Sequence, residues 1–385
     1  MEDPPQVNHY LRKFEDEVIL LTGATGAIGA CLLFKLAVRL PTKKVYALCR
    51  GSIGDAIRKL ESVMPQIEDI LDSGKVEFVT GDLTRPGLGS DSAVRERMRD
   101  QVTTVINTAA NISLVETLEN LIRDNCQTAM SLFHIASEFR HIRLFIHFSS
   151  VAATSFLPGG VIEERLYDSP GLTTDSADDL AGLPSADASS MEPDDRYPWP
   201  HGQAKHLADR LLLRRSSSVP ILIIRPVAVG PAIAEPFPFY GPDKSLPIHT
   251  MLKRFWFRRV PVDLIANNCL LHLADRTTGV VHCTAPLYVT RKVTDIMSIV
   301  RKCATEAERA EVLPKRAPTG GFMWQNKYQV RSFQSLPTFH FVCAKSEYQK
   351  SITGPLALIP VGHDSDMYLE RRVRKIHLAM LEGTI

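Results

Sequence analysis

The stretch Thr22-Gly23-Ala24-Thr25-Gly26-Ala27-Ile28-Gly29 decides the fold, because its three glycines stand between a strand-like and a helix-like segment. Val18-Ile19-Leu20-Leu21 before it is typical of a buried strand, and residues 30–37 have the apolar spacing of a helix packed on a sheet. The first glycine permits a tight turn, the second lets the backbone approach a pyrophosphate, and the third allows close helix–strand packing. The N–H groups at the helix start then receive the phosphates of a dinucleotide. The predicted cofactor contacts here are Thr22, Gly23, Thr25, Gly26, Ala27, Ile28 and Gly29.

The composition favours a soluble, cytoplasmic protein. The chain has 385 residues and a net charge of +2 without a basic block, which disfavours nucleic acid as a partner. It has no apolar run of the ~18 residues that a membrane span needs. The acidic, Pro-rich residues 1–5 differ from a secretory signal, and seven dispersed cysteines lack metal-ligand spacing. We therefore expect a cytoplasmic protein with reduced thiols, no metal, no membrane span and no nucleic-acid partner.

Strand-like and helix-like segments alternate after the glycine turn. This alternation predicts an α/β fold, a Rossmann-type doubly wound parallel sheet with a smaller C-terminal substrate lobe. The expected strands are Lys44–Cys49, Val76–Thr80, Val102–Ile106, Leu144–Phe148 and Ile221–Ile224, and the expected helices include Asp55–Met64 and Leu118–Phe139.

The boundary between the two expected parts falls near residue 230. Residues 1–230 are predicted to form the dinucleotide-binding domain, with a flexible flap at about 159–195, where Asp, Ser, Pro and Gly are frequent. The sheet pattern ends after Arg225-Pro226. Residues 231–385 are expected to form mainly the substrate lobe, with about 258–275 returning to the Rossmann core.

Arg50 ends the second expected strand, about twenty residues after the glycine turn. At this position an acidic residue would hold the ribose hydroxyls of NAD, whereas a guanidinium pairs with the 2′-phosphate of NADPH. Arg58, further along in the next helix, is a second candidate for this contact. The sequence therefore favours NADPH over NADH, although either arginine could instead be a solvated surface residue.

Two further segments follow expected strands, at the sheet edge where ligands bind in such folds. Asp82 and Leu83 come after the third strand, where an aspartate can meet the adenine amino group. The small residues Thr108, Ala109 and Ala110 come after the fourth strand and let the backbone approach the cofactor. Both segments are predicted to line the cofactor site.

Taken together, these motifs resemble an extended short-chain dehydrogenase/reductase. The chain is most similar to the group that includes the thioester reductase domains of nonribosomal peptide synthetases, the terminal domains of carboxylic acid reductases, and the fatty acyl-CoA reductases. The resemblance covers roughly residues 16–300, and further matching pieces are Asn125-Cys126-Gln127-Thr128, Phe148-Ser149-Ser150, Gln203-Ala204-Lys205, Arg225-Pro226 and Val260-Pro261-Val262-Asp263. It implies that Asn125, Lys205, Pro226 and Val229 also contact the cofactor.

In this superfamily a Ser or Thr, a Tyr and a Lys carry out the reaction. The Tyr and Lys stand four residues apart and share one helix face. The resemblance implies that Ser150 polarises the substrate oxygen and that Lys205 holds the nicotinamide ribose. The tyrosine is missing, because His201 occupies the position four before Lys205. Tyr197 is separated from this helix by two prolines and is not expected to replace the missing tyrosine.

His201 leaves three interpretations open. In the first, the chain is an NADPH-dependent reductase of an acyl thioester, aldehyde or ketone in secondary metabolism, with His201 as the proton donor. In the second, it is a redox-neutral isomerase, cyclase or lyase that uses His201 as acid or base. In the third, it is a non-catalytic NADPH-binding scaffold. The substrate would be a free molecule or bound to a carrier protein. His147 is expected to be a core histidine. Trp199 and the aromatic residues 255–257 are expected either to line an apolar pocket or to belong to the core.

Overall fold

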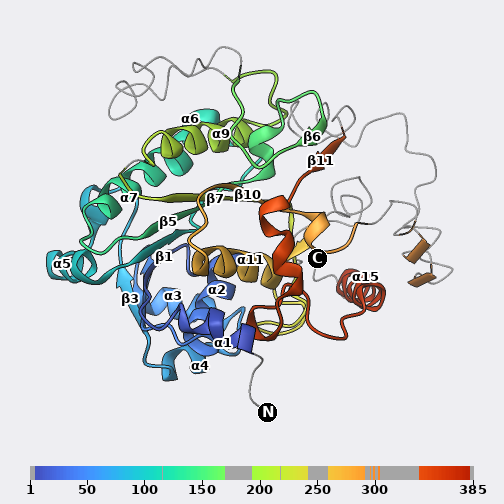
Figure 1. Cartoon of the computed structure of the whole chain (residues 1–385), viewed down its shortest axis with the longest axis horizontal. Helices are drawn as coiled ribbons and strands as arrows, with labels where there is room; N and C mark the ends of the chain where they lie inside the picture. The colour runs from blue at the N-terminus through green and yellow to red at the C-terminus, as the bar shows by residue number, and fades with distance from the viewer. Residues whose placement is uncertain are drawn as a thin grey trace.

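A seven-stranded parallel sheet forms the centre of the molecule (Figure 1). The computed structural model describes residues 5–114, 116–169, 193–216, 218–241, 259–290, 295, 298–299, 302–303 and 338–381. The strand order is β10-β7-β5-β4-β1-β2-β3. The strands are β1 (Val18–Thr22), β2 (Lys44–Cys49), β3 (Val76–Thr80), β4 (Thr104–Asn107), β5 (Leu144–Phe148), β7 (Ile221–Pro226) and β10 (Gly279–Cys283). This order confirms the predicted Rossmann-type doubly wound sheet.

Helices cover both faces of the sheet, as Figure 1 shows. Side chains alternate along each strand, so Leu21 and Ile146 pack on one face while Leu20 and Phe145 pack on the other. The first face carries α2 (Ala27–Phe34) and α11 (Val262–Ala274), and the second carries α5 (Ser92–Gln101), α7 (Thr128–Ser137) and α9 (Pro200–Leu213). Parallel strands buried on both faces explain the continuous apolar runs in the sequence.

The remaining described elements are short, apart from the last helix. The α-helices are α1 (Pro5–Arg12), α3 (Ile53–Glu61), α4 (Ile67–Asp72), α6 (Leu118–Leu121) and α15 (Ser365–Leu381). Two π-helical segments, η1 (Lys35–Arg39) and η3 (Ile122–Gln127), continue α2 and α6. The 3-10 helices are η2 (Pro86–Gly89), η4 (Val151–Thr154), η7 (Ala285–Leu287), η8 (Ala344–Ser351) and η9 (Gly354–Leu356). Two small pairs of strands complete the set, β6 (Gly160–Ile162) with β11 (Phe339–Phe341) and β8 (Val229–Gly230) with β9 (Val260–Pro261).

The expectation that the sheet ends after Arg225-Pro226 is wrong, because β10 adds a further parallel strand beside β7. A histidine within the strand interrupts the apolar pattern by which the sequence would predict it. His282 is fully buried there, and its Nδ1 lies 2.8 Å from the carbonyl oxygen of Val342. The C-terminal part of the chain therefore supplies both an edge strand and the partner of a buried histidine.

The expected flap has an anchored first part. Its strand β6 pairs with β11, and Arg225 Nη1 donates a hydrogen bond of 3.0 Å to the carbonyl oxygen of Arg165. Asp168 forms an ion pair with Arg210 on α9. Residues 170–192 of the expected flap lie outside the described residues, as do the aromatic residues 255–257. The domain boundary near residue 230 stays a prediction.

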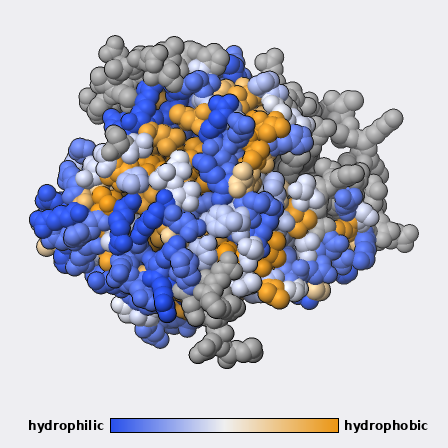
Figure 2. Space-filling model, viewed as in Figure 1, coloured by the Kyte–Doolittle hydropathy of each residue, from blue (hydrophilic) through white to orange (hydrophobic). Residues whose placement is uncertain are grey.

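The surface varies across the view of Figure 2. Hydrophobic residues gather toward the middle of this face, and the left-hand margin, where the arginine-rich helix α5 lies, is hydrophilic. None of the described helices has both the length and the apolar character to cross a bilayer. All seven cysteines belong to the described residues and are buried free thiols.

Candidate active site

The glycine turn packs so tightly that only glycine fits at two of its positions. Gly23 has a φ of +68°, and a Cβ there would lie 2.6 Å from Thr108 Oγ1. A Cβ on Gly29 would lie 2.1 Å from the carbonyl oxygen of Gly23. Thr108 in turn donates a hydrogen bond of 2.7 Å to the carbonyl oxygen of Thr22. The cap of α2 is Gly26, which brings no side chain over the first N–H groups of the helix. This cradle fits a pyrophosphate.

Cationic side chains stand at the ends of β2 and α3, beside this turn. Arg50 directly follows β2 and is exposed. Arg58 forms an ion pair with Asp55 in which both side chains are mostly exposed. The neighbouring Lys59 donates a hydrogen bond of 3.3 Å to Thr25 Oγ1 in the glycine turn. Sequence reasoning missed Lys59, because only the placed helix shows which of two adjacent cations faces the turn.

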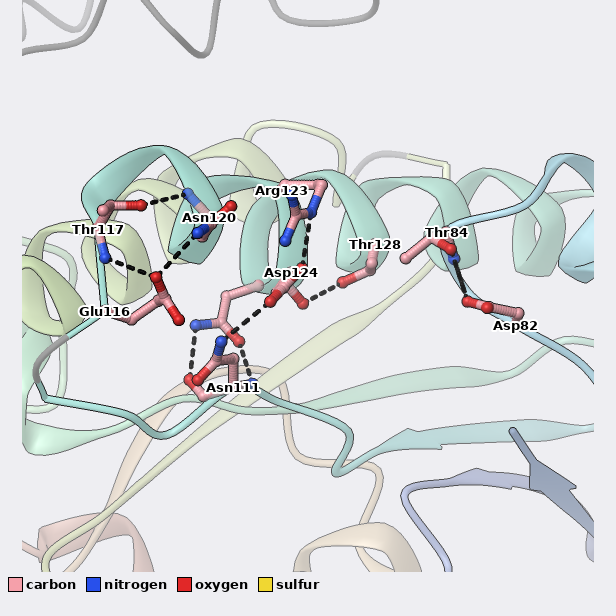
Figure 3. A network of polar contacts seen from close by, with 10 residues as sticks. Asp82, Thr84, Asn111, Glu116, Thr117, Asn120, Arg123, Asp124 and Thr128 are labelled. Atoms are coloured by element: carbon pink, nitrogen blue, oxygen red, sulfur yellow. Dashed lines mark hydrogen bonds and ion pairs between the residues drawn. The ribbon is translucent and has the colours of Figure 1, made fainter. Parts of the chain in front are cut away.

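Asp82 and Leu83 follow β3 at the same edge of the sheet. Asp82 Oδ1 accepts hydrogen bonds of 2.9 Å and 2.7 Å from the backbone N and the hydroxyl of Thr84, as Figure 3 shows. These bonds, followed by the charge of Arg50, lower the pKa of Asp82. The carboxylate is therefore charged and held in place, and its contact with an adenine amino group stays a prediction.

Asn125 holds the chain that follows β4. Its Oδ1 accepts from the backbone N of Asn111 and its Nδ2 donates to the carbonyl oxygen of Asn111, each at 2.9 Å. Asn111 Nδ2 also donates to Asp124, which pairs with Arg123 (Figure 3). Asn125 lies in the π-helical segment η3, which interrupts the expected helix Leu118–Phe139. The widened turn is typical of functional positions and brings this side chain to the strand end.

Helix α9 approaches the end of β5 very closely. A Cβ on Gly202 would lie 2.6 Å from the carbonyl oxygen of Ala152 and 2.9 Å from Ser155 Oγ, so a glycine is needed at this contact. Ser150 caps η4, and its Oγ accepts a hydrogen bond of 3.1 Å from the backbone N of Ala152. Among the described residues the Ser150 hydroxyl donates no hydrogen bond, which leaves its hydrogen for a substrate oxygen.

Lys205 and His201 lie on α9, one turn apart, and both are buried. Lys205 Nζ donates a hydrogen bond of 3.0 Å to the carbonyl oxygen of Phe148, and burial lowers the pKa of Lys205 to about 8. Burial and then the charge of Lys205 lower the pKa of His201 to about 4, against a smaller opposing effect of the Asn111 backbone. His201 is therefore a neutral imidazole near pH 7.

The proton of that imidazole can be placed on one nitrogen. Contact with the Asn111 backbone raises the pKa of His201, as a carbonyl acceptor does. His201 Nδ1 is buried and makes no hydrogen bond within the described residues. We therefore assign the proton to Nε2, which leaves a lone pair on Nδ1.

Tyr197 does not take the place of the missing tyrosine. It precedes the first residue of α9, Pro200, and its hydroxyl pairs with His206 Nδ1. Phe156 packs against both rings. Burial raises the pKa of Tyr197 to about 12, so the phenol is a weak acid in a separate aromatic cluster.

His147 links to the glycine turn through a buried polar row across three neighbouring strands. Thr22 Oγ1 donates to Asn107 Oδ1 at 2.6 Å, and Asn107 Nδ2 lies 3.1 Å from His147 Nδ1. The three residues are in register on β1, β4 and β5. His147 is thus a core histidine, as expected, although its Nε2 finds no hydrogen-bond partner in the described part of the chain.

The remaining predicted residues lie around the same sheet edge. Pro226 ends β7, and Val229 belongs to β8, which pairs with β9. Ala27 and Ile28 begin α2, and the carbonyl oxygen of Ala27 accepts from the Tyr240 hydroxyl at 3.3 Å. The described residues thus bring the glycine turn, Ser150 and Lys205 to the carboxyl ends of β1 and β5.

A glycine cradle at β1 and a serine–lysine pair at β5 define a nicotinamide-dinucleotide-binding protein of the Rossmann type. The chain belongs to the male sterility protein family of NAD-binding domains, whose profile matches residues 21–268. This finding confirms the group indicated by the sequence motifs.

This chain is similar in sequence to curated proteins named fatty acyl-CoA reductase. It is 29% identical to "Fatty acyl-CoA reductase 1" of Gallus gallus over 247 residues, which cover 60% of this chain and 47% of that protein. The chain thus spans about half the length of the curated relatives it matches. Its fold is similar to the terminal R domain of the myxalamid PKS-NRPS pathway (TM-score 0.63, 18% identity, 95% of this chain and 92% of that one). It is also similar to an NRPS reductase domain from Mycobacterium tuberculosis (TM-score 0.61, 16% identity, 98% and 96%).

Proposed function

We propose that this chain is an NADPH-dependent oxidoreductase that reduces acyl thioesters. The observation that carries the proposal is the placement of Ser150 and Lys205 at the end of β5, beside a glycine cradle that fits a dinucleotide. The reductase names of the similar proteins support an acyl thioester as substrate. A cytoplasmic location and a role in secondary metabolism belong to the same proposal.

Two cations support NADPH as the cofactor. Arg50 directly follows β2, where a 2′-phosphate would lie, and Lys59 reaches the glycine turn through Thr25. A phosphate that gains two charge-assisted contacts is favoured over a bare hydroxyl. NADPH, when bound, supplies the hydride that is added to the carbonyl carbon.

Ser150 is proposed to polarise the carbonyl of the substrate. Its Oγ accepts from Ala152, which fixes the oxygen and leaves the hydroxyl hydrogen to point at a second acceptor. As the hydride reaches the carbonyl carbon, negative charge develops on the oxygen. A hydrogen bond that strengthens with this charge stabilises the transition state.

We propose a proton source other than His201, the donor of the first interpretation. A histidine with a pKa of about 4 and a lone pair on Nδ1 is a poor proton donor near pH 7. Lys205, with a pKa of about 8, is mostly an ammonium at that pH and is the better donor. We therefore propose that Lys205 supplies the proton and that His201 accepts a hydrogen bond.

This arrangement favours release of an aldehyde. After hydride addition the carbon–sulfur bond breaks, the carbonyl re-forms, and the thiolate takes one proton. A thiol has a pKa of about 8.5, so this proton is needed far less than the one an alkoxide takes when an aldehyde becomes an alcohol. Without a tyrosine beside Lys205, the first reduction should outpace the second. The thioester would be presented on coenzyme A or on a carrier protein.

A redox-neutral reaction is the second candidate. The lone pair on His201 Nδ1, buried beside Lys205, is suited to accept a proton from a substrate carbon or hydroxyl. An isomerase, cyclase or lyase would use this group without net consumption of NADPH.

One assay separates these candidates. Purified protein is mixed with NADPH or NADH and with acyl thioesters of different chain length, and both nicotinamide consumption and aldehyde formation are followed. The proposal expects thioester-dependent oxidation of NADPH, strongly reduced in Lys205→Met. Conversion of a substrate without NADPH consumption would establish the redox-neutral candidate instead.

A further inference from the structure

The buried ammonium of Lys205 needs a compensating negative charge nearby. Lys205 is 2% exposed, and its hydrogen bond goes to a neutral carbonyl, that of Phe148. Within the described residues, no carboxylate lies within ion-pair distance of Lys205 Nζ. An ammonium left without compensation in such a place would lose its proton.

The groups that face Lys205 come from three elements. His201 and Asp209 lie one turn before and one turn after it on α9. His147 on β5 and Cys126 on η3 complete the set. Burial keeps both histidines neutral and holds the pKa of the Cys126 thiol at about 12, so none of these three groups compensates the ammonium. Among these groups, Asp209 is the one carboxyl, and a buried guanidinium pairs with it.

Asp209 is itself fixed by a buried partner. Arg225 Nε and Nη2 each lie 2.8 Å from Asp209 Oδ2, and both side chains are fully buried. Burial raises the pKa of Asp209. The charge of Arg225, a contact with Ser149 directly after β5 and the charge of Lys205 oppose this rise. The guanidinium thus holds the carboxylate on the side of α9 that faces β5 and β7.

We propose that Asp209 is a positioning residue that keeps Lys205 an ammonium, and that Arg225 holds Asp209 in place for this task. The inference rests on the proposed role of Lys205 as proton donor. Lys205, Asp209 and Arg225 together carry a net positive charge of one. This excess positive charge can stabilise the oxyanion that develops on the substrate. The site is thus electrostatically preorganised for hydride addition.

The test is a direct titration of Lys205. The protein is labelled with carbon-13 at the lysine Cε, its NMR signals are followed against pH, and the Lys205 signal is assigned by its loss in Lys205→Arg. In the wild type we expect the midpoint near pH 8. Asp209→Asn should lower it by about one unit, because an opposite charge nearby shifts a pKa by one to three units.

A matched control is a carboxylate that pairs with the same helix. Asp168→Asn removes the partner of Arg210 on α9, and the Asp168 side chain is largely exposed and is not among the groups that face Lys205. Its Lys205 midpoint should equal that of the wild type. Equal midpoints in the wild type and a folded Asp209→Asn protein would overturn the proposal.

Two further variants complete the design. Removing one partner of a buried ion pair can prevent folding, whereas removing both charges is often tolerated. If Asp209→Asn does not fold, Asp209→Asn/Arg225→Met should show the same lowered midpoint, and an unchanged midpoint would contradict the inference. Asp209→Glu should restore most of the wild-type value. The titration needs no substrate, so a protein that titrates as expected but reduces no thioester contradicts the proposed function alone.

Discussion

His201 precedes Lys205 by one turn of α9, and the charge of Lys205 helps to keep the imidazole of His201 neutral. In the related dehydrogenases this position is a tyrosine, whose deprotonation the lysine promotes. With a histidine there, the same neighbour has a different effect: it disfavours the imidazolium that would serve as proton donor. The chemistry of the site therefore depends on which of the two residues carries the proton.

The pH dependence of turnover distinguishes the two residues. If Lys205 is the donor, the rate should fall as the pH rises through about 8, where the ammonium is lost, and stay level from about pH 7 down to 6. A His201 donor would instead give a rate that keeps increasing toward acid over this whole range, because its pKa of about 4 leaves a small imidazolium fraction that grows as the pH falls. Initial rates at saturating NADPH across this range make the comparison, and an increase toward acid would contradict the assignment.

Replacing His201 with tyrosine should restore the proton donor that is common in this superfamily. We expect His201→Tyr to increase aldehyde reduction by about a hundredfold, the lower end of the range usual for general acid catalysis. His201→Phe, which has the ring without the hydroxyl, serves as the control. Product analysis by mass spectrometry gives the ratio of alcohol to aldehyde. A ratio that is the same in both variants would show that the missing phenol does not limit the second reduction.

The cations near the glycine turn should determine the choice of cofactor. Arg50→Ala and Lys59→Ala should each weaken NADPH binding by about tenfold, since a hydrogen bond to a charged group contributes roughly 1.5–3 kcal/mol. NADH binding should hardly change. Arg58→Ala is the matched control, because Arg58 pairs with Asp55 and is largely exposed. Calorimetric titration measures both cofactors, and an equal loss for NADPH and NADH would argue against a 2′-phosphate contact.

Gly202 tests the close contact of α9 with η4. A Cβ there would overlap the carbonyl oxygen of Ala152, so Gly202→Ala should lower the free energy of unfolding by about 1–3 kcal/mol. Gly54→Ala in α3 is the control, since its Cβ would lie 3.4 Å from Arg58 Nη1 and gains helix propensity. Chemical denaturation measures both variants. Equal stability of Gly202→Ala and the wild type would mean that the helix can move away from β5 without cost.

Much of the sheet could be predicted from local apolar patterns. The strands Lys44–Cys49, Val76–Thr80 and Leu144–Phe148 have the predicted ends, because each is a buried run bounded by polar or turn-forming residues. The strand β10 is not predicted, because the buried His282 breaks its apolar run. The hydrogen-bond partner of His282, Val342, lies far along the chain.

The site was less accessible to sequence reasoning. The interruption of the helix after Leu118 depends on the bonds of Asn125 to Asn111, which are tertiary contacts. The pairing of Asp209 with Arg225 likewise becomes visible only once α9 lies on β7. The histidine at 201 was evident from the sequence, but its neutral state follows from burial beside Lys205.

The transfer of deuterium from NADPH to the product tests the central claim most directly. The protein is incubated with an acyl thioester and NADPH that carries deuterium at the transferable position of the nicotinamide, and the product is analysed by mass spectrometry. Both faces of the nicotinamide are labelled in separate experiments, so that either stereochemistry is detected. The account predicts an aldehyde with one deuterium on its carbonyl carbon and one NADPH consumed per thioester. A converted substrate without deuterium in either experiment, or bound NADPH that no thioester oxidises, would contradict it.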